Sequence, residues 1–194
     1  ECDVTFTQDL ALVCRHSQCD LATTTNILQT PLAAKCSKPF RPANGQQPAS
    51  ATCCTTDISL AEFKTLCARP DQSNKKAKTV AQYLAPLRSP VVSKPLACGT
   101  LMTHAQSIEL IDALGRKFTP ELKRPMVDMP FAPGFTQAAY ADKLLAEYRA
   151  AGIDPSRVYP QSFNPDDIWH WVKNHPDFAD QAVWLDAGGR RPGF

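Results

Sequence analysis

Two acidic residues at the start of the chain have a spacing that suits metal binding. Glu1 and Asp3 are two residues apart in a stretch, up to Phe6, that is typical of a strand. Because successive side chains of a strand point to opposite faces, both carboxylates lie on the same face. Carboxylate oxygens are the ligands that hard cations such as Mg²⁺ and Ca²⁺ prefer. The pair alone is weak evidence, since acidic pairs of this kind more often lie on a solvated strand face.

A second pair with the same spacing joins an acid to a base. Glu121 and Lys123 lie in the stretch 117–123, which we predict to be a strand, so they too share a face. One interpretation is an exposed ion pair. The functional interpretation is a third metal carboxylate beside a cation that binds a phosphate oxygen. Pro120 and Pro125 flank these residues and indicate a strand that ends near a loop.

One histidine follows a predicted strand directly and lies in a loop. His16 comes after the strand that ends at Cys14, and Cys14 and Cys19 are close enough in the sequence to close a disulfide around this loop. A histidine in such a loop, beside a metal site, could act as a general acid or base. The other histidines lie on predicted helices or at helix ends, where we expect surface positions: His104, His170 and His175.

The residues from Gly99 onward alternate between helical and strand patterns. Predicted helices cover 103–114, 136–151 and a segment from 164 onward, and predicted strands cover 117–123, 157–163 and 181–186. This alternation is typical of parallel βαβ units. A complete (β/α)₈ barrel needs about 250 residues, whereas the chain has 194. The pattern therefore leaves open a smaller open sheet and a part of a barrel.

The third predicted helix has the clearest start. Asn164 caps it and Pro165 takes its first position, which are the preferred residue types at those positions. Ile168, Trp169 and Val172 are spaced so that they share one side of the helix. We predict that this side faces the core.

Eight cysteines lie between Cys2 and Cys98, and none forms a CxxC pair of the kind that binds zinc. An even number of scattered cysteines predicts disulfides and an oxidising compartment. Adjacent Cys53 and Cys54 are expected to bond to different partners, because a bond between neighbours distorts the peptide. The rest of the pairing stays open, since eight cysteines allow about 105 connectivities.

The composition excludes several classes of protein. A content of 43% hydrophobic and 21% charged residues is that of a globular protein rather than a disordered one. A net charge of +2 is too small to indicate a nucleic-acid partner. No apolar run approaches the roughly 18 residues of a membrane-spanning helix. The P-loop, GxSxG, GxGxxG and HExxH motifs are all absent from the sequence, so nucleotide-driven and serine-hydrolase chemistry have no support.

In their order and spacing, these segments resemble the glycerophosphodiester phosphodiesterase family. Residues 1–16 are similar to the family's segment of ExDV followed by TxD, valine and histidine. Residues 120–123 are similar to its internal ExK strand, and residues 161–163 to a later strand that ends in Ser-Phe. The segment 19–98 resembles the cysteine-bearing insertion of a secreted, fungal-like or bacterial branch.

The resemblance implies a secreted hydrolase with a TIM (β/α)₈ barrel that cleaves glycerophosphodiesters to glycerol 3-phosphate and an alcohol. It implies a divalent metal, Mg²⁺ or Ca²⁺, a small-molecule substrate, and neither a nucleic-acid partner nor a transmembrane segment. The implied site residues are Glu1, Asp3 and Glu121 for the metal, His16 for acid–base catalysis, and Lys123, Gln161 and Trp184 for the substrate.

The chain also departs from the family's pattern. The family begins with a His-Arg-Gly strand and a loop with a further glutamate, which this sequence lacks, and no strand is expected after Asp186. We therefore expect one partial barrel domain over residues 1–194, without its first and last strands, with a cysteine-rich insertion at 19–98. The alternatives are a non-catalytic, disulfide-stapled protein with a binding or structural role, and a secreted phospholipase D toxin. The long insertion argues against the toxin.

Overall fold

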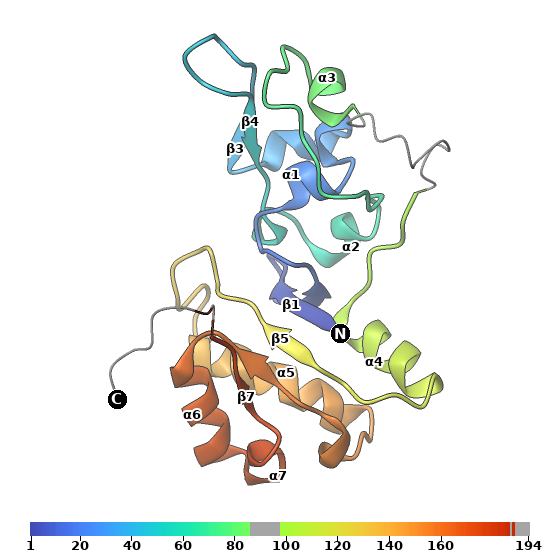
Figure 1. Ribbon diagram of the computed structural model, residues 1–194, viewed down its shortest axis with the longest axis vertical. Coiled ribbons are helices and arrows are strands. Elements are labelled where there is room, and N and C mark those ends of the chain that lie inside the picture. The colour runs from blue at the N-terminus through green and yellow to red at the C-terminus, as the bar shows by residue number, and fades with distance from the viewer. Residues whose placement is uncertain (86–97, 187, 189–194) are drawn as a thin grey trace. The chain divides into compact units, whose positions relative to one another are not determined.

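The computed structural model describes residues 1–85, 98–186 and 188, which form two compact units (Figure 1). The first, here called the sheet unit, contains Glu1–Thr5, Cys14–Ser17 and the described residues from Thr103 onward. The second, the cysteine-rich unit, contains Phe6–Val13 and the described residues of Gln18–Met102. A single partial barrel domain with an insertion at 19–98 stays a prediction.

Parallel strands form the framework of the sheet unit. The described residues give a five-stranded sheet in the order β2-β1-β5-β6-β7. Its strands are β1 (Cys2–Phe6), β2 (Leu12–Cys14), β5 (Pro120–Leu122), β6 (Gln161–Ser162) and β7 (Val183–Trp184). The pairs β1–β5, β5–β6 and β6–β7 are all parallel. The predicted α/β fold with a parallel sheet is therefore confirmed, and the strands are shorter than their sequence patterns indicate.

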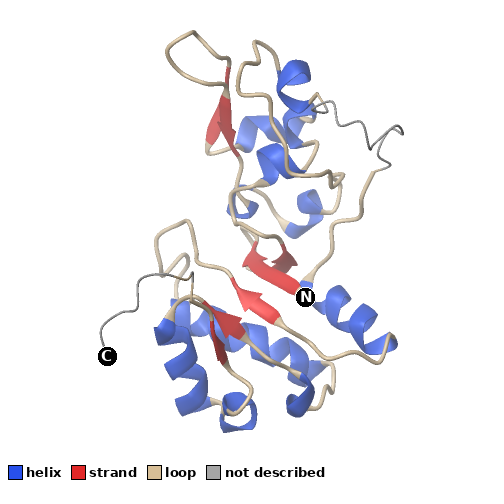
Figure 2. Ribbon diagram, in the orientation of Figure 1, coloured by secondary structure: helices blue, strands red, loops and turns tan. Residues whose placement is uncertain are grey.

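Helices connect these strands, as the alternating pattern predicts (Figure 2). They are α4 (His104–Ala113), α5 (Gln137–Ala150), the 3₁₀ turn η4 (Pro155–Arg157), α6 (Pro165–Asn174) and α7 (Pro176–Ala179). The side chains of Thr103, Thr136 and Asn164 accept hydrogen bonds from backbone N–H groups of the first turns of α4, α5 and α6. Because these caps satisfy otherwise unpaired donors, they fix where each helix begins.

The inner face of α6 is not the one that the sequence predicts. Trp171 is fully buried and donates a hydrogen bond from Nε1 to the carbonyl oxygen of Ala141 on α5, at 3.2 Å. Trp169 and Val172 are instead 69% and 40% exposed. The prediction was wrong because both tryptophans fit a helical stripe, and only the position of α5 decides which one is covered.

One expectation about α4 also fails. His104, expected at the surface, is fully buried; its Nδ1 lies 2.8 Å from Glu147 Oε2 and its ring makes an edge contact with Tyr148. Leu110 and Leu114, which belong to the apolar pattern of this helix, are exposed. The carboxylate of Glu147 on α5 gives Nδ1 of this buried histidine a hydrogen-bond partner.

Short elements make up the cysteine-rich unit. They are α1 (Leu21–Thr24), η1 (Ile27–Gln29), η2 (Pro31–Lys35), β3 (Lys38–Arg41), β4 (Ser50–Thr52), η3 (Thr55–Asp57), α2 (Leu60–Phe63) and α3 (Val80–Leu84). β3 and β4 pair as an antiparallel ribbon. Ser59 and Glu62 form a capping box at α2, and Phe63 of this helix is buried in the core. The core of this unit includes Leu21, Ile27 and Ile58.

All eight cysteines form disulfides, as predicted. The pairs are Cys2–Cys14, Cys19–Cys54, Cys36–Cys53 and Cys67–Cys98. Cys53 and Cys54 have different partners, which confirms that expectation. The disulfide between Cys14 and Cys19 that the sequence suggested does not form, because Cys14 lies on a strand beside β1 and bonds to Cys2. Among the described residues, no helix combines the length and the apolar character needed to span a membrane.

Candidate functional site

The register of three strands places acidic and amide side chains side by side. Asp3 on β1 is paired with Glu121 on β5, and Glu121 is paired with Gln161 on β6. Glu1 lies two residues before Asp3 and therefore on the same side of the sheet. Carboxylate oxygens of Glu1, Asp3 and Glu121 all lie within 4.8 Å of one another. The parallel register thus brings together residues 120 positions apart.

Lys123 lies against this group of carboxylates. Its Nζ is 2.7 Å from Glu121 Oε1 and 3.7 Å from Asp3 Oδ1, and its side chain is only 14% exposed. Its backbone N–H donates to the carbonyl oxygen of Val4, so the chain beyond β5 continues along β1. The lysine is therefore fixed at both its backbone and its ammonium group.

Gln161 and Trp184 come from the next two strands. Gln161 donates from Nε2 to Glu1 Oε1 at 3.0 Å, which holds the first carboxylate toward the group. Trp184 on β7 is paired with Ser162, one residue beyond Gln161, and is 38% exposed. Gln161 therefore joins the acidic group directly, whereas Trp184 lies two strands away from Glu121.

The electrostatics of this group favour an added cation. Burial raises the pKa of Glu121 above its ordinary value; the hydrogen bond from Lys123 opposes the rise and the Asp3 carboxylate adds to it. Three carboxylates outweigh the single positive charge of Lys123. A half-buried set of oxygen donors with excess negative charge fits Mg²⁺ or Ca²⁺. The residues present therefore fit the divalent metal that the resemblance implies.

His16 is exposed and lies in the loop after β2. It lines an open hollow together with Ser17, Lys123 and Arg124. The loop is held by the Cys2–Cys14 disulfide and by a hydrogen bond from Arg15 N to Asp3 O, at 2.7 Å. The histidine is thus anchored to β1, the strand that carries Asp3, and faces the same hollow as Lys123.

A buried carboxylate beside the group was not singled out from the sequence. Asp167 on α6 lines a second hollow, together with Glu121 and Lys123. It is 3% exposed and accepts hydrogen bonds from Gln137 Nε2, Ser162 Oγ and Asn164 Nδ2 at 2.9, 2.8 and 3.1 Å. The sequence showed Asp166 and Asp167 only as acids that suit a helix start.

Burial of Asp167 gives a testable dependence on pH. Burial raises its pKa above 3.8, although three hydrogen bonds oppose the rise. Because the folded state then binds the proton more tightly than the unfolded state, this residue stabilises the fold most at low pH. Its contribution decreases as pH rises through the folded-state pKa. We expect the free energy of unfolding of Asp167→Asn, relative to wild type, to increase with pH over that range.

Chemical unfolding of both proteins at several pH values measures this difference. Asp166→Asn is a matched control, because Asp166 is exposed in the same helical turn. A difference between Asp167→Asn and wild type that is constant with pH would contradict the predicted shift.

Comparisons with known proteins bear on this geometry. Residues 1–179 match the Glycerophosphoryl diester phosphodiesterase family. The chain belongs to this family. A solved structure titled a putative glycerophosphoryl diester phosphodiesterase from Silicibacter pomeroyi DSS-3 matches with a TM-score of 0.58, at 16% identity. The match covers 91% of this chain and 51% of that one, and at this identity it supports the fold alone.

A curated relative of this phosphodiesterase-family chain comes from Arthroderma benhamiae and is named "Extracellular protein". The two are 43% identical over 120 residues, which are 60% of this chain and 48% of the relative. The chain therefore spans about half the length of the proteins that it matches.

Proposed function

We propose that the full-length protein is a secreted, metal-dependent phosphodiesterase that hydrolyses glycerophosphodiesters to glycerol 3-phosphate and an alcohol. The observation that carries the proposal is the convergence of Glu1, Asp3 and Glu121 beside Lys123, in a chain of this family. The parallel sheet would then be part of a (β/α)₈ barrel of the phosphodiesterase type, with the segment 19–98 as an insertion in it.

Each side chain has a role that suits its position. Glu1, Asp3 and Glu121 would hold Mg²⁺ or Ca²⁺, and Lys123 would bind a phosphate oxygen. When bound, a divalent cation offsets the negative charge that builds up on the phosphate. The positive charge of Lys123 would also stabilise the negative phosphate. This attraction is stronger in a partly buried site than in water, because the charges are screened less there.

His16 would move the proton. Hydrolysis adds the oxygen of water to phosphorus and breaks the bond from phosphorus to the alcohol oxygen. A proton must leave the water and one must reach the alcohol, and His16 is the described imidazole that faces the hollow beside Lys123. Gln161 and Trp184 would form walls for the substrate.

Secretion has its own support. The chain has four disulfides, which are typical of proteins in oxidising compartments, and the relative from Arthroderma benhamiae is named an extracellular protein. Family members act on small molecules, so the proposed partner is a small glycerophosphodiester.

The test is release of glycerol 3-phosphate from glycerophosphocholine by the full-length protein, with and without a chelator. We expect chelation to abolish turnover and Mg²⁺ or Ca²⁺ to restore it. We expect His16→Gln to reduce kcat by about 10²–10⁴-fold, the usual contribution of a general acid or base. The substitution is at an exposed loop residue, so the melting temperature should not change.

Four outcomes would contradict the proposal. Turnover that survives chelation would show that the reaction does not need a metal. Full activity of His16→Gln would show that His16 has no catalytic role. No turnover of glycerophosphocholine or other glycerophosphodiesters by the folded full-length protein at saturating metal would favour the non-catalytic alternative. Turnover of sphingomyelin instead would favour phospholipase D chemistry.

A further inference from the structure

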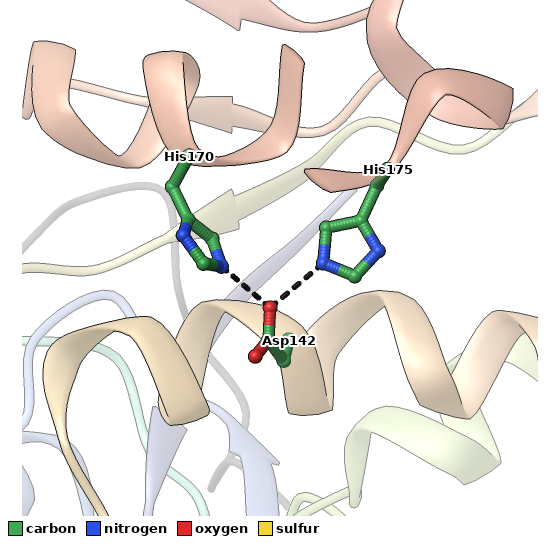
Figure 3. Close-up of side chains that lie close together, drawn as sticks. All are labelled: Asp142, His170 and His175. Atoms are coloured by element: carbon green, nitrogen blue, oxygen red, sulfur yellow. Dashed lines mark hydrogen bonds and ion pairs between the residues drawn. The ribbon is translucent and has the colours of Figure 1, made fainter. Parts of the chain in front are cut away.

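A second cluster of ligand-type side chains lies on the helices of the sheet unit (Figure 3). Asp142 on α5 is approached by two histidines, His170 on α6 and His175 between α6 and α7. The Nε2 atoms of His170 and His175 lie 2.6 and 2.7 Å from the same oxygen, Oδ1 of Asp142. Figure 3 shows both rings, one from α6 and one from the chain between α6 and α7, pointing at the carboxylate on α5. All three residues are partly buried.

The backbone beneath the cluster is held firmly. Trp171, the residue after His170, is fully buried and bonds to Ala141, the residue before Asp142. This contact fixes α6 against α5 at the level of the cluster. The backbone N–H of His175 donates to the carbonyl oxygen of Trp171 at 2.8 Å, which fixes the second histidine relative to the first. The three side chains therefore start from positions that the core determines.

Two imidazole nitrogens and one carboxylate oxygen are the donor set that zinc and similar divalent transition metals prefer. The acidic group of Glu1, Asp3 and Glu121 offers only oxygen and suits harder cations. We propose that Asp142, His170 and His175 form a second metal site, which binds Zn²⁺ through one carboxylate and two Nε2 atoms. This site is independent of the proposed hydrolysis, because it uses none of the residues assigned to that reaction.

The contacts to the other ring nitrogens determine where the protons go. Asn174 Nδ2 lies 3.1 Å from His170 Nδ1, and Arg149 Nη2 lies 3.0 Å from His175 Nδ1. Because a guanidinium only donates, Nδ1 of His175 accepts and its proton resides on Nε2. The same arrangement holds at His170 while the amide of Asn174 donates. Both Nε2–H groups then donate to Asp142 without metal.

Metal binding reverses this arrangement. Each neutral imidazole keeps one proton, which moves from Nε2 to Nδ1 when Nε2 binds the metal. Asn174 can rotate its amide so that Oδ1 accepts this proton from His170, which breaks the hydrogen bond of 3.0 Å from its Nδ2 to the His170 carbonyl oxygen. Arg149 cannot accept, so it must leave His175; its paired hydrogen bonds to Asp177, at 3.1 and 2.8 Å, hold it after that move. Arg149 therefore competes with the metal for His175.

The site is tested by titrating the full-length protein with Zn²⁺ in a buffer that contains excess Mg²⁺. We expect one Zn²⁺ per chain and an affinity that falls roughly 100-fold or more in His170→Gln and His175→Gln, since loss of outer-shell partners alone costs about 10–100-fold. Arg149→Gln, which supplies an acceptor in place of a cation, should tighten binding. The exposed Asp180→Asn is a control and should bind Zn²⁺ as wild type does.

A measurement on the wild-type protein keeps the proposal testable if the histidine variants do not fold. Long-range ¹H–¹⁵N correlation spectra report which ring nitrogen of each histidine carries the proton. Zn²⁺ should move the proton of His170 and His175 from Nε2 to Nδ1. Unchanged spectra of these rings at saturating Zn²⁺ would overturn the proposal, as would Zn²⁺ binding that is equal in wild type and His170→Gln. The cluster would then be a hydrogen-bonded contact between α5 and α6.

Discussion

We expect the Glu121→Gln variant of the full-length protein to hydrolyse glycerophosphodiesters at least roughly 100-fold more slowly than wild type, because it removes a direct ligand where outer-shell changes alone cost about 10–100-fold. Glu121 is 7% exposed and lies between Asp3 and Gln161 in the register of the sheet. Its carboxylate is also the closer partner of Lys123. Glutamine keeps the shape but removes the charge, so both the metal and the lysine lose a partner.

The measurement is kcat/KM for glycerophosphocholine over a range of Mg²⁺ and Ca²⁺ concentrations. High metal should recover part of the activity, since the variant binds metal more weakly rather than folding differently. Glu109→Gln is the matched control, because it makes the same chemical change at an exposed position of α4. Metal-dependent turnover that is intact in Glu121→Gln would show that the metal residues are assigned wrongly.

The largest loss of stability is expected from Trp171→Ala, by about 3–5 kcal/mol in the free energy of unfolding, the usual cost of truncating a buried aromatic side chain. Trp171 is fully buried and its Nε1 bonds to Ala141 on α5. The substitution leaves a cavity between α5 and α6 and removes the hydrogen bond from Trp171 Nε1 to the carbonyl oxygen of Ala141. Urea unfolding followed by far-ultraviolet circular dichroism measures the change.

Trp169→Ala gives a control on the same helix with the same change in volume. Trp169 is 69% exposed, so the change in unfolding free energy should stay within about 0.5 kcal/mol. Equal losses in the two variants, or a larger loss in Trp169→Ala, would mean that the face of α6 predicted from the sequence is the buried one.

Local features were predictable from the sequence because they depend on neighbouring residues. Asn164 caps its helix as predicted, since a cap needs only a side-chain oxygen and the next backbone turn. The period of two along a strand likewise predicted that Glu1 and Asp3 share a face. The exclusion of a bond between Cys53 and Cys54 follows from the geometry of adjacent residues alone.

Features that depend on distant parts of the chain could not be predicted in the same way. Trp169 and Trp171 are two residues apart and so lie on nearly opposite sides of α6, and which of them is covered depends on where α5 lies. His170 and His175 were expected at the surface, because nothing local in the sequence indicates that Asp142 of another helix faces both of them. In the sequence, Asp167 looks like any acidic residue at the start of a helix. Only the structure shows that it is buried and accepts hydrogen bonds from Gln137 and Ser162.

The sequence by itself determined the kinds of residue that could form a metal and phosphate site, the strand–helix alternation that carries them and the presence of disulfides. Only the tertiary structure decided that Asp3, Glu121 and Gln161 occupy one row across three strands, and that Cys14 bonds to Cys2 rather than to Cys19. The physical reason is that strand register and disulfide pairing depend on the packing of segments far apart in the chain. Spacing along the sequence restricts that packing only weakly.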